Sequence, residues 1–160
     1  MVLMRRRTKG LLRDEAYRDP SNVTARQSLW CNLEEPPDPF WRLSFVDWTG
    51  NEMVFDVGCG NGLDLGQLAG GGRCAQVVAV DLSEGMLASL SWTSALAVLV
   101  VRVQGDAHAL PFRDGTADVV LAMHMLYHLA DMDAALGDIV RVLKPGGCPG
   151  GLDEQRRFDG

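Results

Sequence analysis

The chain has 160 residues, 47% of them hydrophobic, which suffices for one domain with a buried core but not for two. Its 15 basic and 21 acidic side chains give a formal net charge of −6, so the whole molecule repels nucleic-acid backbones and anionic lipids. The four cysteines form no Cys-x-x-Cys pair, and no apolar run approaches the roughly 20 residues of a membrane span. We therefore predict a cytoplasmic protein with reduced thiols, no metal site and no membrane attachment, and the charge disfavours a nucleic-acid partner without excluding it.

Residues 1–52 are predicted to form an N-terminal helical segment on the substrate side. Trp41, Phe45 and Trp48 recur at helical spacing, which places them on one helix face. Packing on the core is the favoured interpretation of this face, and lining of a substrate site is the alternative. The basic cluster 5–9 is interpreted as a solvated tail rather than an RNA contact.

Four short apolar runs follow, separated by helical segments. They are Met53–Val57, Gln76–Val80, Val98–Val103 and Asp118–Ala122. Each run is apolar nearly throughout, which is typical of parallel strands covered on both faces. Strands alternating with helices predict a Rossmann-like, doubly wound α/β sheet over residues 53–147.

The helical segments show inward faces and end signals. Three apolar faces are predicted: Leu65, Leu68 and Ala69; Met86, Leu87 and Leu90; and Leu136, Ile139, Val140 and Leu143. The first helix should end at the glycines 70–72, and Ser83 should cap the start of the second.

A glycine-rich loop stands where the first strand should meet the first helix, the place where open α/β sheets bind ligands. Its sequence is Asp56-Val57-Gly58-Cys59-Gly60-Asn61-Gly62. A dinucleotide fingerprint would need glycine at position 63 or 65, and both are leucine. The Asp56 carboxylate would also repel a pyrophosphate, whereas it would attract an ammonium and a sulfonium group. These charges favour S-adenosylmethionine over NAD.

Four motifs in order resemble those of class I S-adenosylmethionine-dependent methyltransferases, in particular the ubiquinone and menaquinone biosynthesis group. The motifs are Val54–Gly62, Val77–Ser83, Gly105–Phe112, and Asp118–Leu129 followed by Arg141–Gly147. The resemblance covers about residues 53–147 and implies S-adenosylmethionine as cofactor, with strand order 3-2-1-4. It also implies nine cofactor-binding residues: Asp56, Gly58, Gly60, Gly62, Asp81, Leu82, Met86, Asp106 and Ala107.

The resemblance assigns these residues to parts of the cofactor. The glycine loop would hold the methionine part with Asp56 near its amino group, and Asp81 would accept hydrogen bonds from the ribose hydroxyls. Independently, Asp81 follows the loop by about the length of one helix and one strand, which brings its carboxylate beside the glycines. Asp106 would accept from the adenine amino group, and the Ala107 N–H would reach the ring. Met86 would pack on the adenine or belong to the core, and Asp106 has a turn role as its alternative.

A histidine and tyrosine group follows the fourth strand, at the expected open end of the site. His124 is the candidate general base, while Tyr127 and His128 are expected to pack or to shape the site. The segment lacks the Asn/Asp-Pro-Pro-Tyr loop with which related enzymes methylate nucleobases. A small-molecule methyl acceptor is therefore favoured.

The family pattern breaks after Gly147. Residues 148–154 stand where a fifth strand should run, and Pro149 with its neighbouring glycines disfavours a central strand. We therefore expect a core shortened after the fourth strand, an irregular tail at 148–160, and self-association through the exposed edge of the fourth strand. Two alternatives stay open: a non-catalytic S-adenosylmethionine-binding module or pseudoenzyme, and, least favoured, a dinucleotide-binding fragment.

Overall fold

A computed structural model describes residues 43, 46–70, 72–91, 99–123 and 125–150. Most of the predicted N-terminal segment, including Trp41 and Phe45, lies outside the described residues. The same holds for the candidate base His124 and for the tail 151–160.

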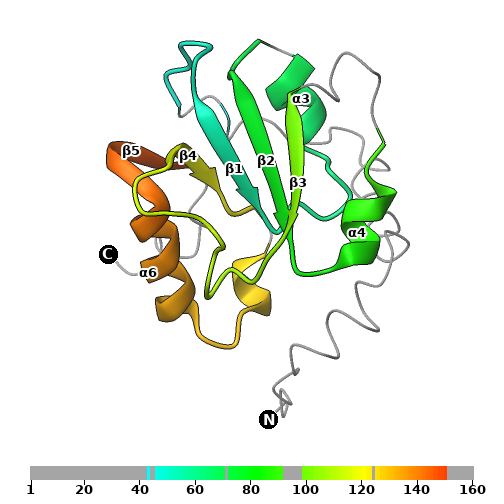
Figure 1. The fold of residues 1–160 in the computed structure, drawn as a ribbon, viewed down its shortest axis with the longest axis vertical. Helices are drawn as coiled ribbons and strands as arrows, with labels where there is room; N and C mark the ends of the chain where they lie inside the picture. The colour runs from blue at the N-terminus through cyan, green and yellow to red at the C-terminus, as the bar shows by residue number, and fades with distance from the viewer. Residues whose placement is uncertain (1–42, 44–45, 71, 92–98, 124, 151–160) are drawn as a thin grey trace, which may run out of the picture.

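The described part is built on a parallel sheet of five strands in the order β3-β2-β1-β4-β5 (Figure 1). The strands are β1 Met53–Val57, β2 Gln76–Asp81, β3 Val100–Gln104, β4 Ala117–Leu121 and β5 Leu143–Gly150. The first four were predicted: the bounds of β1 agree with the prediction, and the ends of the other three differ from it by at most two residues. The doubly wound, Rossmann-like α/β class is thereby confirmed.

The fifth strand corrects two sequence expectations. β5 pairs in parallel with β4, with Leu143 opposite Ala117 and Cys148 opposite Val119. The expectation that the strands end with the fourth is therefore wrong, and so is the assignment of residues 148–150 to an irregular tail. The predicted self-association through an exposed edge of the fourth strand loses its basis, because β5 covers that edge.

β5 forms despite Pro149 because of the position of this proline in the sheet. Pro149 lies opposite Val120 in β5, the outermost strand of the described sheet, and an outer strand tolerates a residue that cannot donate to the ladder. Residues 144–147 pass opposite the single residue Asp118, where the pairing is irregular. Lys144 Nζ lies 2.8 Å from both Asp118 carboxylate oxygens, and this ion pair ties the irregular segment to β4.

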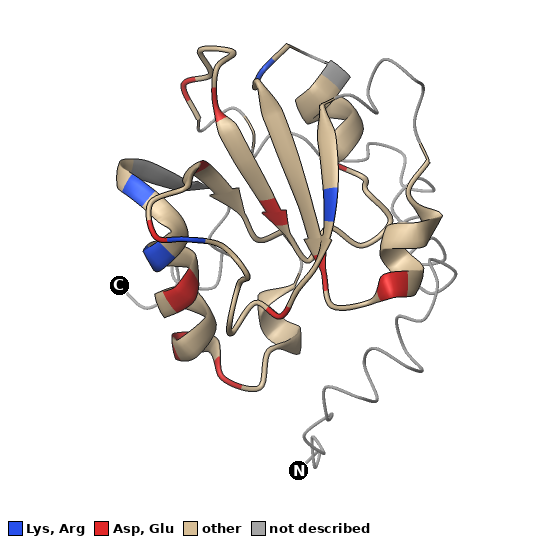
Figure 2. Cartoon of the chain, in the orientation of Figure 1, with Lys and Arg blue, Asp and Glu red and all other residues tan. Residues whose placement is uncertain are grey.

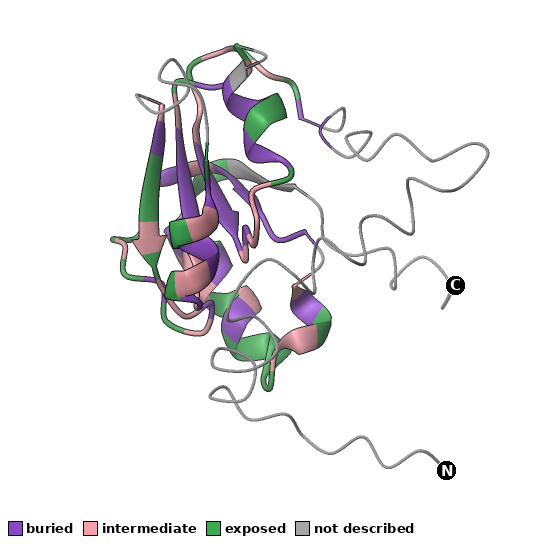
Figure 3. Ribbon diagram, turned by 90° about the vertical axis from the view of Figure 1, so that its right-hand side faces the viewer, coloured by how far each residue is buried: buried purple, intermediate pink, exposed green. Residues whose placement is uncertain are grey.

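Helices cover both faces of the sheet. They are α3 Leu65–Gly70, α4 Glu84–Ser89 and α6 Met132–Val142, with the short 3-10 helix η3 Leu126–His128 before α6. The core on one face includes Leu65, Leu68, Leu87 and Leu90 with Val54 and Val77. The core on the other face includes Ile139 and Val142 with Phe55, Val78 and Val120. Figure 3 shows buried residues along the central strands between these two layers. None of the helices in the described ranges is long and apolar enough to cross a membrane.

The helix signals are confirmed except at Val140 and at Leu143, which begins β5 instead of ending the face of α6. The Ser83 side chain caps α4 by accepting a 3.2 Å hydrogen bond from the Met86 N–H, as predicted. In α6, however, Val140 is 65% exposed, and the helix buries Ala135, Ile139 and Val142 instead. The prediction for Val140 is wrong because the spacing was anchored on the larger side chains, whereas the small Ala135 sets the inward face.

Candidate functional site

The glycine loop between β1 and α3 folds over the end of β2. The N–H groups of Gly58 and Cys59 both donate to the Val80 carbonyl, at 2.8 and 3.0 Å, and the Gly62 N–H donates to the Cys59 carbonyl at 2.9 Å. Gly58, Gly60 and Gly62 have φ angles of +73°, +54° and +78°, a region in which other residues are strained. Backbone conformation alone therefore explains why glycine occupies all three positions.

The surroundings of the three glycines differ. A Cβ at Gly58 would lie 2.7 Å from the Cβ of Met125, and one at Gly62 would lie 2.6 Å from a Leu90 methyl group. A Cβ at Gly60 would meet nothing within 4 Å. Gly58 and Gly62 are thus fixed by packing, whereas the Gly60 backbone borders open space that a ligand can enter.

Acidic residues gather where β1, β2 and β3 end (Figure 2). Asp56, on β1, is 2% exposed. Burial raises its pKa well above the usual 3.8, and the charges of Asp64 and Asp81 raise it further. A buried carboxylate that is repelled by two further carboxylates is a site that a cation would stabilise.

Two further residues complete the environment of this loop. Asp64 is 9% exposed at the start of α3, where its main-chain carbonyl accepts from the N–H groups of Gln67 and Leu68. Sequence reasoning missed it, although a carboxylate directly before the first helix was a signal. Burial and the charges of Asp56 and Asp81 raise the pKa of the Cys59 thiol, which therefore stays protonated and is a poor nucleophile.

Asp81 joins the glycine loop to α4. Its Oδ2 accepts from the Gly60 N–H at 2.9 Å, and its Oδ1 accepts from the Ser83 N–H at 2.8 Å. Burial raises the pKa of Asp81, while these bonds act in the opposite direction. The sequence spacing placed this carboxylate beside the glycines, and the structure brings them into direct contact.

The segment after β3 reaches the same end of the sheet. The Gly105 N–H donates to the Asp81 carbonyl at 3.0 Å, which places the next residues beside the end of β2. Asp106 accepts at Oδ1 from the His108 N–H at 3.0 Å and contacts His108 Nδ1 at 2.6 Å. Ala107 is buried in the core on the α6 side. Both predicted residues thus directly follow the residue that bonds to Asp81, and their contacts with adenine remain predictions.

The remaining predicted site residues lie around α4 and η3. The Leu82 carbonyl accepts from Gln104 Nε2 at 3.1 Å, and Met86 is 1% exposed. The Tyr127 and His128 rings lie 4.2 Å apart between centroids, and Tyr127 is 53% exposed. Packing of Met86 on adenine and shaping of the site by the two rings remain predictions.

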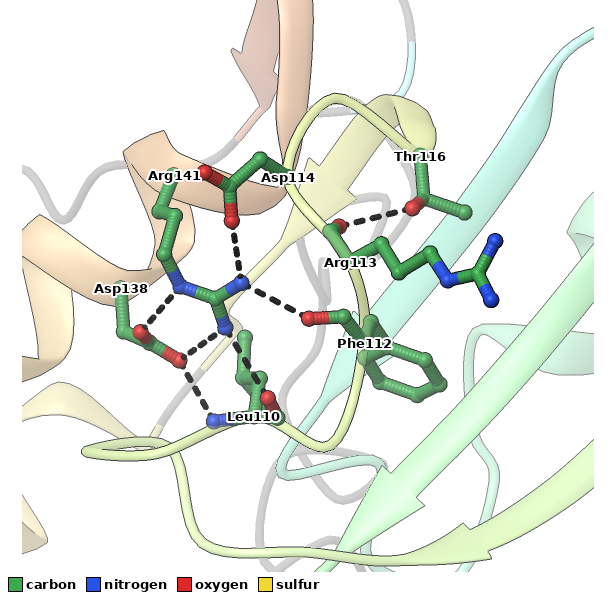
Figure 4. Close-up of polar contacts among 7 residues, drawn as sticks. All are labelled: Leu110, Phe112, Arg113, Asp114, Thr116, Asp138 and Arg141. Atoms are coloured by element: carbon green, nitrogen blue, oxygen red, sulfur yellow. Dashed lines mark hydrogen bonds and ion pairs between the residues drawn. The ribbon is translucent and has the colours of Figure 1, made fainter.

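An aspartate and arginine pair on α6 holds the second half of the loop after β3 (Figure 4). Arg141 Nε donates to Asp138 Oδ1 at 2.7 Å, and its Nη1 donates to the Phe112 carbonyl at 2.7 Å and to Asp114 at 2.8 Å. Its Nη2 donates to the Leu110 carbonyl at 3.0 Å, and Asp138 Oδ2 accepts from the Leu110 N–H. Sequence reasoning placed Arg141 in a motif but missed Asp138, because its partner is 28 residues away.

Comparison with known proteins identifies this arrangement. Residues 55–148, more than half of the chain, match the family described as Methyltransferase domain. Demethylmenaquinone methyltransferase from Mycolicibacterium vanbaalenii is 37% identical over 113 residues, which is 69% of this chain and 46% of that protein. The chain spans 31% to 63% of the length of the curated relatives it matches.

Solved structures agree on the fold. An S-adenosylmethionine-dependent methyltransferase from Aquifex aeolicus superposes with a TM-score of 0.58 at 26% identity, covering 74% of this chain and 67% of that one. The [4+2]-cyclase SpnF superposes with a TM-score of 0.57 at 32% identity, covering 61% of this chain and 37% of that one. With the matching family, the sheet order and the glycine loop in agreement, the chain belongs to the class I S-adenosylmethionine-dependent methyltransferases.

Proposed function

We propose that the chain binds S-adenosylmethionine at the carboxyl ends of β1, β2 and β3 and transfers its methyl group to a small-molecule acceptor. The observation that carries this proposal is the buried Asp56 carboxylate, near enough to Asp64 and Asp81 for their charges to raise its pKa, beside a glycine loop whose Gly60 backbone faces open space. A ligand for this place must carry positive charge and approach main-chain groups closely.

The residues present fit that cofactor. When bound, S-adenosylmethionine supplies a methyl group on a positively charged sulfur. Asp56 would hold its ammonium group, Gly60 and its neighbours would hold the methionine part, and Asp81 would hold the ribose hydroxyls. Asp106 and the Ala107 N–H would hold the adenine. Binding in this way orients the methyl group, and orientation supplies much of the rate of an in-line displacement.

The acceptor is proposed to be a small molecule. Relatives at 33% to 37% identity are demethylmenaquinone methyltransferases, so a quinol or a similar phenol is the first class to test. The net charge of −6 disfavours a nucleic acid. His124 is proposed as the general base, because a hydroxyl or an acidic carbon must lose a proton during methylation.

A second candidate function deserves the same test. SpnF, at 32% identity, is described as a [4+2]-cyclase, so a relative of this chain is known by a reaction other than methyl transfer. This chain would then bind the cofactor without transferring its methyl group.

The experiment follows label from methyl-labelled S-adenosylmethionine into a panel of quinols, phenols and transfer RNA. Label in a quinol or phenol supports the proposal, and label in RNA alone contradicts the small-molecule acceptor. Binding of S-adenosylhomocysteine without transfer to any acceptor supports the second candidate. A His124→Gln variant should lose turnover and keep S-adenosylhomocysteine affinity, whereas unchanged turnover would remove His124 as the base.

A further inference from the structure

His108 lies between the segment that carries Asp106 and the start of α6. Its Nδ1 is 2.6 Å from Asp106 Oδ1, and its Nε2 accepts from the Asp131 N–H at 3.4 Å. The His108 side chain is 14% exposed, less than the 27% of Asp106. The imidazole therefore fills the space between two segments that are 23 residues apart in the chain.

These contacts define where the imidazole carries its proton. Nε2 faces an N–H donor and so acts as an acceptor, which leaves the proton on Nδ1. Nδ1 then donates to Asp106 Oδ1, and the His108 main-chain N–H donates to the same oxygen at 3.0 Å. Two bonds to one oxygen fix the rotation of the Asp106 carboxylate and the direction of its lone pairs.

The Nε2 end of the imidazole contacts Asp131, a residue that is itself held in place at the start of α6. Asp131 caps α6, since its Oδ1 accepts from the Ala134 N–H at 3.0 Å. His108 thus connects the Asp106 carboxylate to the start of α6, so the orientation of this carboxylate depends on the helix as well as on its own loop.

We propose that His108 is a positioning residue that makes this site select an adenine over a base with a carbonyl group at the same position. This inference rests on the proposed function and deepens it. An oriented carboxylate accepts from an exocyclic amino group, whereas it repels a carbonyl oxygen. A carboxylate that rotates freely loses part of this selectivity.

The test compares S-adenosylhomocysteine with S-inosylhomocysteine, in which a carbonyl replaces the amino group of the base. Calorimetric titration gives both dissociation constants for the full chain. The wild type should prefer S-adenosylhomocysteine by about tenfold or more, the size expected for a hydrogen bond to a charged group. His108→Leu removes both imidazole contacts and should reduce this preference severalfold. Val140→Ala, on the exposed side of α6, is the control and should leave the preference unchanged.

Two amide variants separate positioning from a merely structural role. His108→Asn puts an amide N–H near the place of Nδ1 and should keep the preference, whereas His108→Gln reaches toward Asp131 and should lose it. This pair also decides the matter if His108→Leu fails to fold. Equal preferences in the wild type, Asn and Gln proteins would overturn the inference and leave the proposed function standing. A wild type that binds neither ligand would overturn both.

Discussion

The two loops that form the candidate site are held in place by different means. The glycine loop, Gly58–Gly62, is fixed by its own backbone: three left-handed glycines and main-chain bonds to Val80 and Cys59. The loop after β3 is fixed by side chains of α6 and of His108, through contacts that span 23 to 31 residues of sequence.

The first loop thus depends on its backbone conformation, whereas the second depends on the orientation of one side chain. A glycine loop presents main-chain groups to a ligand, and its shape follows from local φ angles. The loop after β3 presents the Asp106 carboxylate, whose direction depends on distant partners. Substitutions in the first loop should therefore remove binding altogether, whereas those around the second should weaken or redirect it.

The largest effect is expected at Gly58. Gly58→Ala imposes a left-handed φ on alanine and a contact of 2.7 Å with Met125, which together should cost about 2–4 kcal/mol of unfolding free energy. Urea unfolding measures this loss. Gly137→Ala in α6 meets nothing within 4 Å and should instead stabilise by up to about 1 kcal/mol. Equal effects of the two substitutions would contradict the packing argument.

Gly60 sharpens the same comparison. Gly60→Ala adds a methyl group to open space, so the strain of its φ should cost only about 1 kcal/mol of stability. The same methyl group should exclude the cofactor. A folded Gly60→Ala protein with wild-type affinity for S-adenosylhomocysteine would show that the ligand approaches elsewhere.

The next effect is expected at Asp81. Asp81→Ala should weaken S-adenosylhomocysteine binding about 100-fold, because the two proposed hydrogen bonds from the ribose hydroxyls to the charged carboxylate are lost. The chain should remain folded with lower stability, since the Gly60 and Ser83 N–H groups lose their acceptor. Calorimetric titration measures the affinity. Asp47→Ala at an exposed position is the control, and retained affinity in Asp81→Ala would refute the ribose assignment.

A smaller effect is expected at Asp138, in the side-chain clamp of the second loop. Asp138→Ala removes the acceptor of the Leu110 N–H and of Arg141, which should cost about 1–2 kcal/mol in urea unfolding. Asp133→Ala, in the exposed first turn of the same helix, should cost no more than a few tenths of this energy. A similar loss in both variants would mean that the clamp does not stabilise the loop.

The smallest effect is the pH dependence of stability. The folded-state pKa of Asp56 is raised above 3.8, so its ionised form destabilises the fold, and stability should rise as pH falls from neutral toward about 4. The pKa values of Asp118 and Asp138 are lowered by their ion-pair and hydrogen-bond partners, so their stabilisation is lost as pH falls below about 4. Asp56→Asn should add on the order of 1 kcal/mol at neutral pH and reduce the rise, of which the raised pKa of Asp81 leaves a part. Urea unfolding between pH 3 and 8 measures both, and an unchanged profile would contradict the buried charge.

The difference between features set by local sequence and contacts between distant segments also explains what the sequence could predict. The four strands, the helix starting after Ser83 and the contact of Asp81 with the glycines follow from local periodicity and spacing. Asp138 escaped because its partner Leu110 comes from a distant segment, and no local pattern encodes a tertiary contact. β5 escaped for another reason: Pro149 was taken to exclude a strand, although an outer position tolerates it.

The central claim is that the glycine loop and its carboxylates bind S-adenosylmethionine. Thermal unfolding of the 160-residue chain with and without S-adenosylhomocysteine tests it most directly, with NADH as the control ligand and Gly60→Ala as the control protein. At 100 times the dissociation constant, S-adenosylhomocysteine should stabilise the wild type by about 2.7 kcal/mol, while NADH should have no effect and Gly60→Ala should not respond. A cooperative transition that ignores S-adenosylhomocysteine, or one that shifts with NADH instead, would contradict the claim.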